Sequence, residues 1–268
     1  MKIVVCVEQV PATSDAKIDP ETKRIVREGA KAILNPFDLY AIEEAIAVRE
    51  QAGGEVIALS MGPESAKNAL VEALSMGADR AILLSDRAFG GSDTWATSYA
   101  LARAIATIGG VDLVICGKQA VDGDTAQVGV GIAAKLDMLQ AANVWKVESI
   151  SRDSITVKRM NEKGWDIVRL RYPALLTVLK DINEPRVPKL RDARLARNAD
   201  IPVWKPEDIG AETDKIGLKS SPTQVVRTAP PPARGNATRR LDGSPEEMAK
   251  ALAQELRERG FVREVSAL

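Results

Sequence analysis

The chain has 268 residues, enough for one large domain with an appendage, and its 37 basic and 37 acidic residues cancel. That balance provides no overall field for nucleic acid, and no apolar run reaches the roughly 18 residues that would predict a membrane span. Histidine is absent, which excludes Ser-His-Asp triads, Cys-His pairs and imidazole metal ligands. Any chemistry therefore depends on carboxylates, lysines, metals bound through oxygen, or a cofactor.

The first half of the chain alternates short β-branched runs with longer helical patterns. Strands are predicted at residues 3–7, 55–60, 81–85 and 111–116. Helices are predicted at residues 36–52, 63–76, 93–108 and 131–136, the first three ended by glycines and the first begun by an Asn-Pro cap. This alternation is typical of a doubly wound parallel sheet with helices on both faces.

After residue 136 the pattern changes to strands. Residues 143–150, 154–160 and 165–171 predict an added antiparallel ribbon, and residues 174–179 a closing strand. From residue 183 the chain is basic and irregular and then rich in proline, including the run at 230–232, until a helical pattern returns at 244–259. We expect an α/β domain at residues 1–200 and an extended C-terminal arm at residues 201–268 that needs a partner surface. A solvated linker with a terminal docking helix is the alternative.

Two cysteines, Cys6 and Cys116, each end an apolar strand pattern, which favours buried free thiols over a disulfide. The first ten residues read as a strand, without the basic and then apolar layout of a secretory signal. A cytoplasmic protein is therefore expected.

The loop from Cys116 to Gly129 joins a strand to a helix, the place where α/β folds bind nucleotides. Its glycines would let the backbone approach a ligand, and the amides at the start of the helix would cradle a phosphate. Asp122 and Asp124 would repel a phosphate at close range, so they are interpreted as helix caps, as ribose or ring contacts, or as metal ligands. The loop matches neither the dinucleotide fingerprint nor the P-loop pattern.

Three further polar segments fall at the same edge of the predicted sheet, namely residues 35–38, 60–63 and 85–94. Each has a plain structural alternative as a cap or turn, including an N-cap at Ser92-Asp93-Thr94. The last segment superficially resembles the pyrophosphate loop of ATP pyrophosphatases, but that loop belongs directly after the first strand, so an ATP-cleaving ligase is disfavoured. Because the carboxyl ends of parallel strands share one side, the four segments together predict a nucleotide crevice.

An ordered set of short motifs along nearly the full chain resembles the beta subunit of electron-transfer flavoproteins. The motifs are Val4-Val-Cys-Val-Glu-Gln-Val-Pro11, Asn35-Pro-Phe-Asp38, Ser60-Met-Gly-Pro63, Met76-Gly-Ala-Asp79, the loop at 117–129 and Asn183-Glu-Pro-Arg186. The resemblance implies an adenine-nucleotide-binding, Rossmann-like sheet. It also implies a heterodimer with an alpha subunit that carries FAD and a flavodoxin-like domain, which the C-terminal arm embraces.

The resemblance further implies an adenine nucleotide in the beta subunit, AMP in conventional members and a second FAD in those that bifurcate electrons. The segment 86–94 is similar to that of the bifurcating group, which favours FAD over AMP. By position, adenosine would contact Cys6, Asn35 and Met61, and the amides of residues 124–128 would bind phosphate. The full set of expected cofactor contacts is Cys6, Asn35, Asp38, Ser60, Met61, Arg87, Asp93, Thr94, Thr97, Gly117, Asp122, Gly123, Asp124, Thr125, Ala126, Gln127 and Val128. Neither a catalytic side chain nor a metal site is expected.

The implied activity is flavin-based electron transfer. NADH would deliver a hydride to the beta-site FAD, and the two electrons would divide between the alpha-subunit flavin and a low-potential acceptor such as ferredoxin. The basic segment would dock an acyl-CoA dehydrogenase or another flavoenzyme through Arg186, Leu190, Arg191 and Arg194, although a solvated basic stretch is the alternative. Two other functions stay open: a conventional carrier holding AMP, and a universal-stress-type nucleotide-binding module, which the residues after 136 disfavour.

Overall fold

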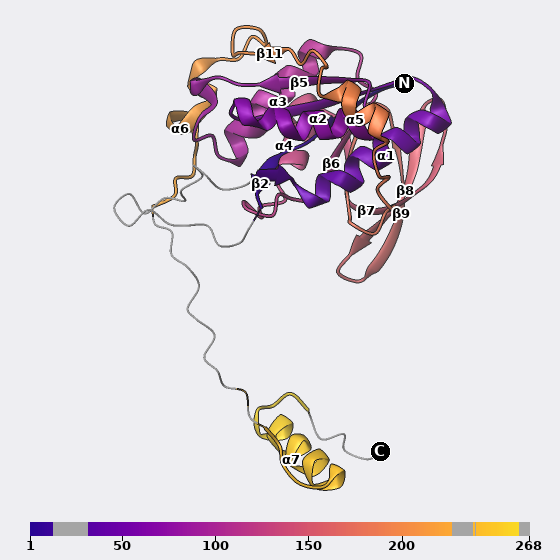
Figure 1. Ribbon diagram of the computed structural model, residues 1–268, viewed down its shortest axis with the longest axis vertical. Coiled ribbons are helices and arrows are strands. Elements are labelled where there is room, and N and C mark those ends of the chain that lie inside the picture. The colour runs from indigo at the N-terminus through magenta and orange to yellow at the C-terminus, as the bar shows by residue number, and fades with distance from the viewer. Residues whose placement is uncertain (13–31, 227–237, 239, 263–268) are drawn as a thin grey trace. The chain divides into compact units, whose positions relative to one another are not determined.

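The computed structural model describes residues 1–12, 32–226, 238 and 240–262. The chain divides into two compact units, Met1–Thr228 and Ala229–Leu268. The first holds the sheet and its helices, and the second holds helix α7 (Figure 1). The proline run at 230–232 lies outside the described residues.

Within the described residues, nine strands form one sheet in the order β11-β5-β4-β1-β6-β10-β7-β8-β9. Neighbours from β11 to β7 are parallel, and β8 and β9 continue the sheet as antiparallel strands. The strands are β1 Lys2–Cys6, β4 Glu55–Met61, β5 Arg80–Leu84, β6 Leu113–Gly117, β7 Leu139–Ile150, β8 Ser154–Asn161, β9 Gly164–Arg171, β10 Ala174–Val178 and β11 Val203–Trp204. Two more strands, β2 Gln9–Pro11 and β3 Ala32–Leu34, form a separate antiparallel pair.

Strand β1 lies at the point where the chain reverses its direction across the sheet. From β1 the chain proceeds outward through β4 to β5, and it then returns to the other side of β1 as β6. The central strands are short and apolar and are buried on both faces, as expected for parallel strands covered by helices. In such sheets the loops on either side of the reversal diverge and leave a crevice at the carboxyl ends of the strands.

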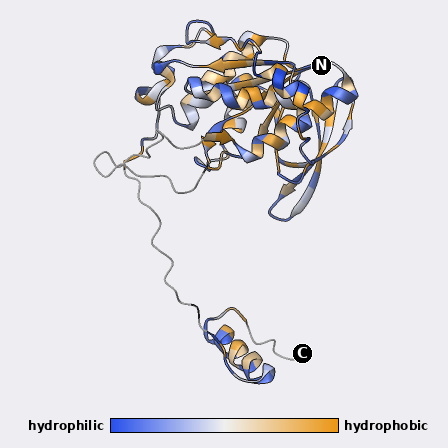
Figure 2. Ribbon diagram, in the orientation of Figure 1, coloured by the Kyte–Doolittle hydropathy of each residue, from blue (hydrophilic) through white to orange (hydrophobic). Residues whose placement is uncertain are grey.

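Helices cover both faces of the sheet (Figure 1). The helices α1 Pro36–Ala52 and α2 Lys67–Met76 pack on one face, and α3 Thr94–Ile108 and α4 Val128–Leu136 pack on the other. Alternate residues of β1 divide between the two cores, with Ile3 and Val5 facing α1 and α2 and Val4 and Cys6 facing α3 and α4. Figure 2 shows the apolar colouring concentrated in the central strands of the sheet. The predicted doubly wound sheet with an antiparallel ribbon is confirmed.

Several elements add to the sequence-based expectation. The predicted strand at residues 174–179 is β10, and it lies between β6 and β7. Residues 190–196 form a helix, α5 Leu190–Ala196, which packs against α2 where an irregular basic stretch was expected. Strand β11 adds an edge to β5 within the segment expected to belong to the arm. Such short elements are stabilised by contacts with distant residues, which periodicity does not report.

The remaining helical elements of the described residues are short turns and one longer helix. They are η1 Glu64–Ala66, η2 Arg87–Phe89, η3 Thr213–Lys215, α6 Gly217–Ser220 and α7 Pro245–Glu258. Helix α7 begins with a capping box, in which Ser244 accepts from the Glu247 amide and the Glu247 carboxylate accepts from the Ser244 amide. No residue along α7 is buried, so its apolar face has no partner within the described part of its own unit. Among the described helices, none combines the length and apolar character required to cross a bilayer.

Candidate nucleotide site

Strands β1 and β6 meet at the chain reversal, and their last residues form the floor of the crevice. Cys6 and Cys116 are register partners on these two parallel strands, and both are buried free thiols. A hydrogen bond with Cys6, and then burial, raises the pKa of the Cys116 thiol well above its ordinary value. Because a neutral buried thiol is a poor nucleophile and metal ligand, Cys116 contributes shape rather than reactivity.

Asn35 links the start of α1 to the loop that follows β6. Its side-chain amide donates to the Gln119 carbonyl oxygen (2.9 Å), and its Oδ1 accepts from the Val121 amide (3.3 Å). The residue occupies the N-cap position of α1, as predicted, but its side chain makes no capping hydrogen bond. The buried side chain instead ties the start of α1 to the root of the β6–α4 loop, which we define as residues 118–127.

Asp38 is a buried carboxyl group beneath the same loop. Its Oδ2 accepts a hydrogen bond from the Glu8 amide (2.8 Å), joining the end of β1 to α1. Burial raises the pKa of Asp38 to about 8, even though hydrogen bonds from Glu8 and Asn35 oppose that rise. Gly117 lies so close that an added Cβ would overlap Asp38 Oδ1 and approach the Phe37 carbonyl carbon to 2.8 Å. Gly117 was expected to let a ligand approach the backbone, but the atoms that lie against it belong to Asp38 and Phe37 of the same chain.

The β6–α4 loop is exposed, and its backbone is strained. Asp124 and Ala126 have φ values of 54° and 55°, in the left-handed region that residues with a side chain seldom adopt. The Asp124 amide donates to the Ala120 carbonyl (2.9 Å), and its carboxylate accepts from the Gln119 side chain. The amides of Thr125 and Ala126 have no hydrogen-bond partner among the described residues. The loop therefore presents two free backbone amides, the kind of donor that binds anions in nests and at helix starts.

Two expectations for this loop need correction. Helix α4 begins at Val128 after a cap at Gln127, so Asp124 does not cap it and instead holds the loop together through Gln119. The Asp124 amide is used within the loop, so the free donors are fewer than the five expected at 124–128. Asp122 and Asp124 do not belong to a metal-binding group, and the described residues contain no cluster of three or more potential ligands.

The β5–α3 loop, which we define as residues 85–93, is built differently. Asp86 accepts from the Ala88 amide (2.8 Å), and Asp93 Oδ1 accepts from the Trp95 (3.0 Å) and Ala96 (3.1 Å) amides, so the predicted cap of α3 is confirmed. Thr94 Oγ1 lies 3.5 Å from Thr125 Oγ1, which brings this loop next to the β6–α4 loop. Arg87 is exposed in η2, and Thr97 lies half-buried on the first turn of α3.

The end of β4 adds a polar atom without a partner. Ser60 is buried at 1% exposure, and its hydroxyl oxygen has no hydrogen-bond partner among the described residues. Met61 follows it as the last residue of the strand. A buried hydroxyl without a partner costs free energy, of order 1–3 kcal/mol, that a polar ligand would relieve. Together with the free amides of Thr125 and Ala126, Ser60 makes these strand ends fit a nucleotide.

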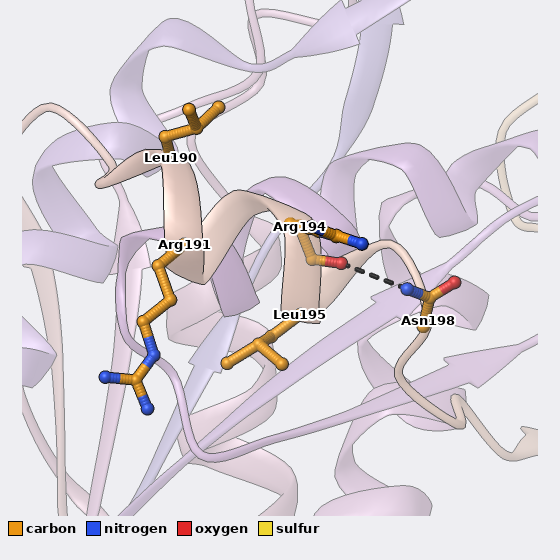
Figure 3. A pocket seen from close by; sticks show the side chains of 5 residues that line it. All are labelled: Leu190, Arg191, Arg194, Leu195 and Asn198. Carbon is orange, nitrogen blue, oxygen red and sulfur yellow. Dashed lines mark hydrogen bonds between the residues drawn. The ribbon is translucent and has the colours of Figure 1, made fainter.

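The predicted docking residues lie away from this crevice. Leu190, Arg191 and Arg194 line a hollow of about 510 Å³ on α5 together with Leu195 and Asn198 (Figure 3). Leu190 is 87% exposed and Leu195 is 61% exposed. Leu195 and Asn198 were not predicted, although Leu190, Arg194 and Asn198 follow one another at the four-residue spacing of a helix face.

Arg186 faces its own chain. Its guanidinium binds Glu43 (2.9 Å) and Glu50 (2.8 Å) on α1, and these two carboxylates raise its pKa. Asn183 adds bonds to the Tyr40 carbonyl (3.0 Å) and to Glu44 (2.9 Å). Arg186 thus anchors the segment that leads into α5.

Comparison with known proteins follows the same outline. The family model for the electron transfer flavoprotein domain matches residues 22–209. Protein FixA of Azorhizobium caulinodans is 46% identical over 263 residues, covering 96% of this chain and 94% of that protein. The electron transfer flavoprotein subunit beta of Thermoanaerobacterium thermosaccharolyticum is 48% identical over 232 residues, covering 86% and 88%. This chain belongs to the electron transfer flavoprotein beta-subunit family.

A third relative of the family carries a more specific name. The caffeyl-CoA reductase-Etf complex subunit CarD of Acetobacterium woodii is 44% identical over 263 residues, covering 98% of this chain and all of that protein. The predicted family and its Rossmann-like sheet are therefore confirmed. Members of the family transfer electrons with flavin and pair with an alpha subunit.

Proposed function

We propose that this beta subunit binds FAD in the crevice at the carboxyl ends of β1, β4, β5 and β6, and that its complex with an alpha subunit bifurcates electrons from NADH. The observation that carries the proposal is the meeting of two loops at the chain reversal. One loop offers the free amides of Thr125 and Ala126, and the other reaches it at Thr94. FAD, once bound, supplies hydride acceptance and one-electron transfer, and the chain supplies binding, orientation and electrostatics.

The nucleotide end of the cofactor has natural partners in the crevice. The amides of Thr125 and Ala126 would bind phosphate oxygens, and Ser60 Oγ would satisfy its hydrogen-bonding capacity on the adenosine part. Asn35 would hold the β6–α4 loop open for the phosphate through its bonds to Gln119 and Val121. AMP and the adenosine-phosphate half of FAD share this chemistry.

The preference for FAD over AMP rests on the β5–α3 loop. Arg87 in η2 and Thr94 and Thr97 on the first turn of α3 would then meet polar groups of the flavin, a part of FAD that AMP lacks. The relative CarD bears the name of a caffeyl-CoA reductase-Etf complex, which supports a partnership with an acyl-CoA-handling flavoenzyme. A low-potential acceptor such as ferredoxin would then receive the second electron.

Flavin analysis of the purified heterodimer tests this proposal. About two FAD molecules per heterodimer support a flavin in the beta subunit, and one FAD with one AMP rejects it in favour of a conventional carrier. NADH should reduce the two-flavin complex without added dehydrogenase. An absence of NADH-dependent bleaching in a complex with two FAD molecules would contradict the proposed electron donor.

Partner docking is proposed for α5. The exposed Leu190 and Leu195 flank Arg191 and Arg194 on a hollow that fits an apolar side chain within an acidic surface. Leu190→Ala should raise the KM for the flavoenzyme partner about tenfold and leave flavin content unchanged. Ile167→Ala, which shortens an apolar side chain that is 71% exposed on β9, is the matched control. An unchanged KM for Leu190→Ala would remove α5 from the docking surface.

A further inference from the structure

The segment after η3 is fastened to the β5–α3 loop by side chains and backbone together. We define this segment, residues 216–223, as the arm root. Its Gly217 amide donates to Ser92 Oγ (2.9 Å), its Leu218 amide donates to the Gly90 carbonyl (3.2 Å), and the buried Ser221 hydroxyl accepts from the Asp93 amide (2.8 Å). These bonds join positions more than 120 residues apart in the chain.

Two glycines allow this close contact. A Cβ on Gly91 would lie 3.0 Å from Leu218 Cβ, and a Cβ on Gly217 would overlap the Ala88 carbonyl oxygen. Both glycines also have positive φ, at 74° and 75°. The arm root and the β5–α3 loop therefore pack closely enough to require glycine at both positions.

Asp93 carries the strongest part of the contact. Its Oδ1 caps α3 at the Trp95 and Ala96 amides, and its Oδ2 accepts from both the Thr223 amide (2.9 Å) and the Thr223 hydroxyl (2.8 Å). Burial opposes ionisation, but the bonds from Thr223, Ala96 and Trp95 outweigh it and hold the pKa of Asp93 below its ordinary value. A carboxylate has about four acceptor sites, so Asp93 is satisfied within the chain.

A continuous set of contacts leads from Asp93 to the β6–α4 loop. The Trp95 amide donates to Asp93, and the Trp95 ring lies with its centroid 3.7 Å from the Lys135 ammonium of α4. The same ammonium donates to the Ser98 hydroxyl on α3 (2.9 Å). Gly131 of α4 has no room for a Cβ against Ser98. Thr94, next to Asp93, meets Thr125 of the β6–α4 loop directly. A change at the start of α3 therefore reaches both the helix and the loop of the phosphate position.

We propose that Asp93 is a positioning residue that couples the C-terminal arm to the nucleotide crevice. When the partner subunit holds the arm, Thr223 keeps Asp93, α3 and the β5–α3 loop in the conformation that retains nucleotide, and release of the arm loosens all three. The inference rests on the proposed function for the identity of the ligand. It assigns Asp93 a role through Thr223 in place of the expected direct contact with the flavin.

Helix α7 supplies the reason for the arm to respond to a partner. Met248, Leu252 and Leu256 follow one another at four-residue spacing, and Leu252 is 49% exposed in a unit that buries no residue of the helix. An amphipathic helix with an uncovered apolar face gains free energy by docking on another surface. Because binding free energies are reciprocal, an arm that stabilises the crevice is itself held more tightly when nucleotide is bound.

The first experiment breaks the contact and spares the cap. Asp93→Asn retains an oxygen for the Trp95 and Ala96 amides, since asparagine is an equally good N-cap, but its amide faces the Thr223 donors. Thr223→Val removes the hydroxyl bond, and Thr223→Ser keeps it. In the heterodimer, nucleotide dissociation followed by flavin fluorescence should be about five- to thirty-fold faster for the first two variants. It should be unchanged for Thr223→Ser and for Thr213→Val, an exposed threonine earlier in the same region.

The second experiment tests the connection to the arm. Leu252→Glu should speed nucleotide dissociation in the wild-type background and add nothing in the Asp93→Asn background, because both changes open the same contact. Full additivity of the two changes, or no effect of Leu252→Glu, would overturn the coupling.

The nucleotide content of the wild-type heterodimer is measured separately and tests the proposed function alone. Hydrogen exchange at the amides of Gly217, Leu218 and Thr223 reads the Asp93 contact without reference to a ligand. Faster exchange in Asp93→Asn with no nucleotide in the wild type would reject the proposed function and keep the contact. A nucleotide-bound wild type with unchanged dissociation in Asp93→Asn and Thr223→Val would reject the coupling.

Discussion

The β5–α3 and β6–α4 loops each connect a parallel strand to a helix, but they differ in how their polar groups are satisfied. The β5–α3 loop satisfies its polar groups within the chain, through the caps at Asp86 and Asp93 and the bonds to the arm root. The β6–α4 loop holds two residues in the left-handed region and leaves the Thr125 and Ala126 amides free. A loop whose polar groups are all hydrogen-bonded within the chain can hold other elements in position. A loop with free amides is suited to bind a ligand.

The largest effect on stability is expected at Gly117, where the β6–α4 loop begins at the end of β6. Gly117→Val would drive a side chain into Asp38 and Phe37, so the start of α1 must move away from β6. The cost should be about 3 kcal/mol or more in the free energy of unfolding, measured by denaturant titration of the beta subunit. A stability within 1 kcal/mol of the wild type would show that this junction is looser than its contacts indicate.

Two aspartates, one beside each loop, should give opposite pH dependence. Asp38 has a folded pKa of about 8 against an ordinary value of 3.8, so between these values the folded chain binds a proton that the unfolded chain has lost. Its contribution therefore makes the free energy of unfolding fall as pH rises from about 4 to about 8, by up to about 1.4 kcal/mol per pH unit. Asp38→Asn should remove this part of the slope in a pH series of denaturant titrations.

Asp93 has the reverse sign. Its folded pKa is lowered, so its contribution is present above the ordinary aspartate pKa and is lost as pH falls through the folded value. Asp93→Asn should therefore reduce stability at neutral pH and make little difference in strong acid. For Asp38, the contradicting result is an equal slope of the free energy of unfolding against pH in the wild type and in Asp38→Asn. That result would show that Asp38 is already ionised near neutrality.

These contacts also show how far the sequence alone could reach. Parallel strands, their helices and the four polar segments were predictable, because apolar periodicity and the Asn-Pro and glycine boundaries are local signals. The role of Gly117 was predicted as an approach to a ligand, yet its neighbour is Asp38, which only the packing of α1 on β6 reveals. Helix α5, β11 and the bond between Asp93 and Thr223 likewise depend on residues far apart in sequence.

Gly123 gives the matched counterpart of Gly117. A Cβ there meets no atom within 4 Å, so Gly123→Val should change the free energy of unfolding by less than about 0.5 kcal/mol. The branched side chain would still obstruct a ligand lying on the loop, and nucleotide retention in the heterodimer should drop about tenfold on gel filtration. Normal retention would place the phosphate elsewhere than at this loop.

The smallest effect is expected for Ala126→Gly. The left-handed φ of 55° costs an alanine roughly 1 kcal/mol, which glycine avoids, but glycine also gains freedom in the unfolded chain. The two terms nearly cancel, so the melting temperature of the free subunit should change by only a few degrees. Nucleotide affinity should weaken two- to fivefold, because the loop no longer holds its free amides in one conformation before the ligand arrives. If nucleotide affinity instead rises, the strain at Ala126 opposes binding, and the free amides of the β6–α4 loop are not preorganised for the ligand.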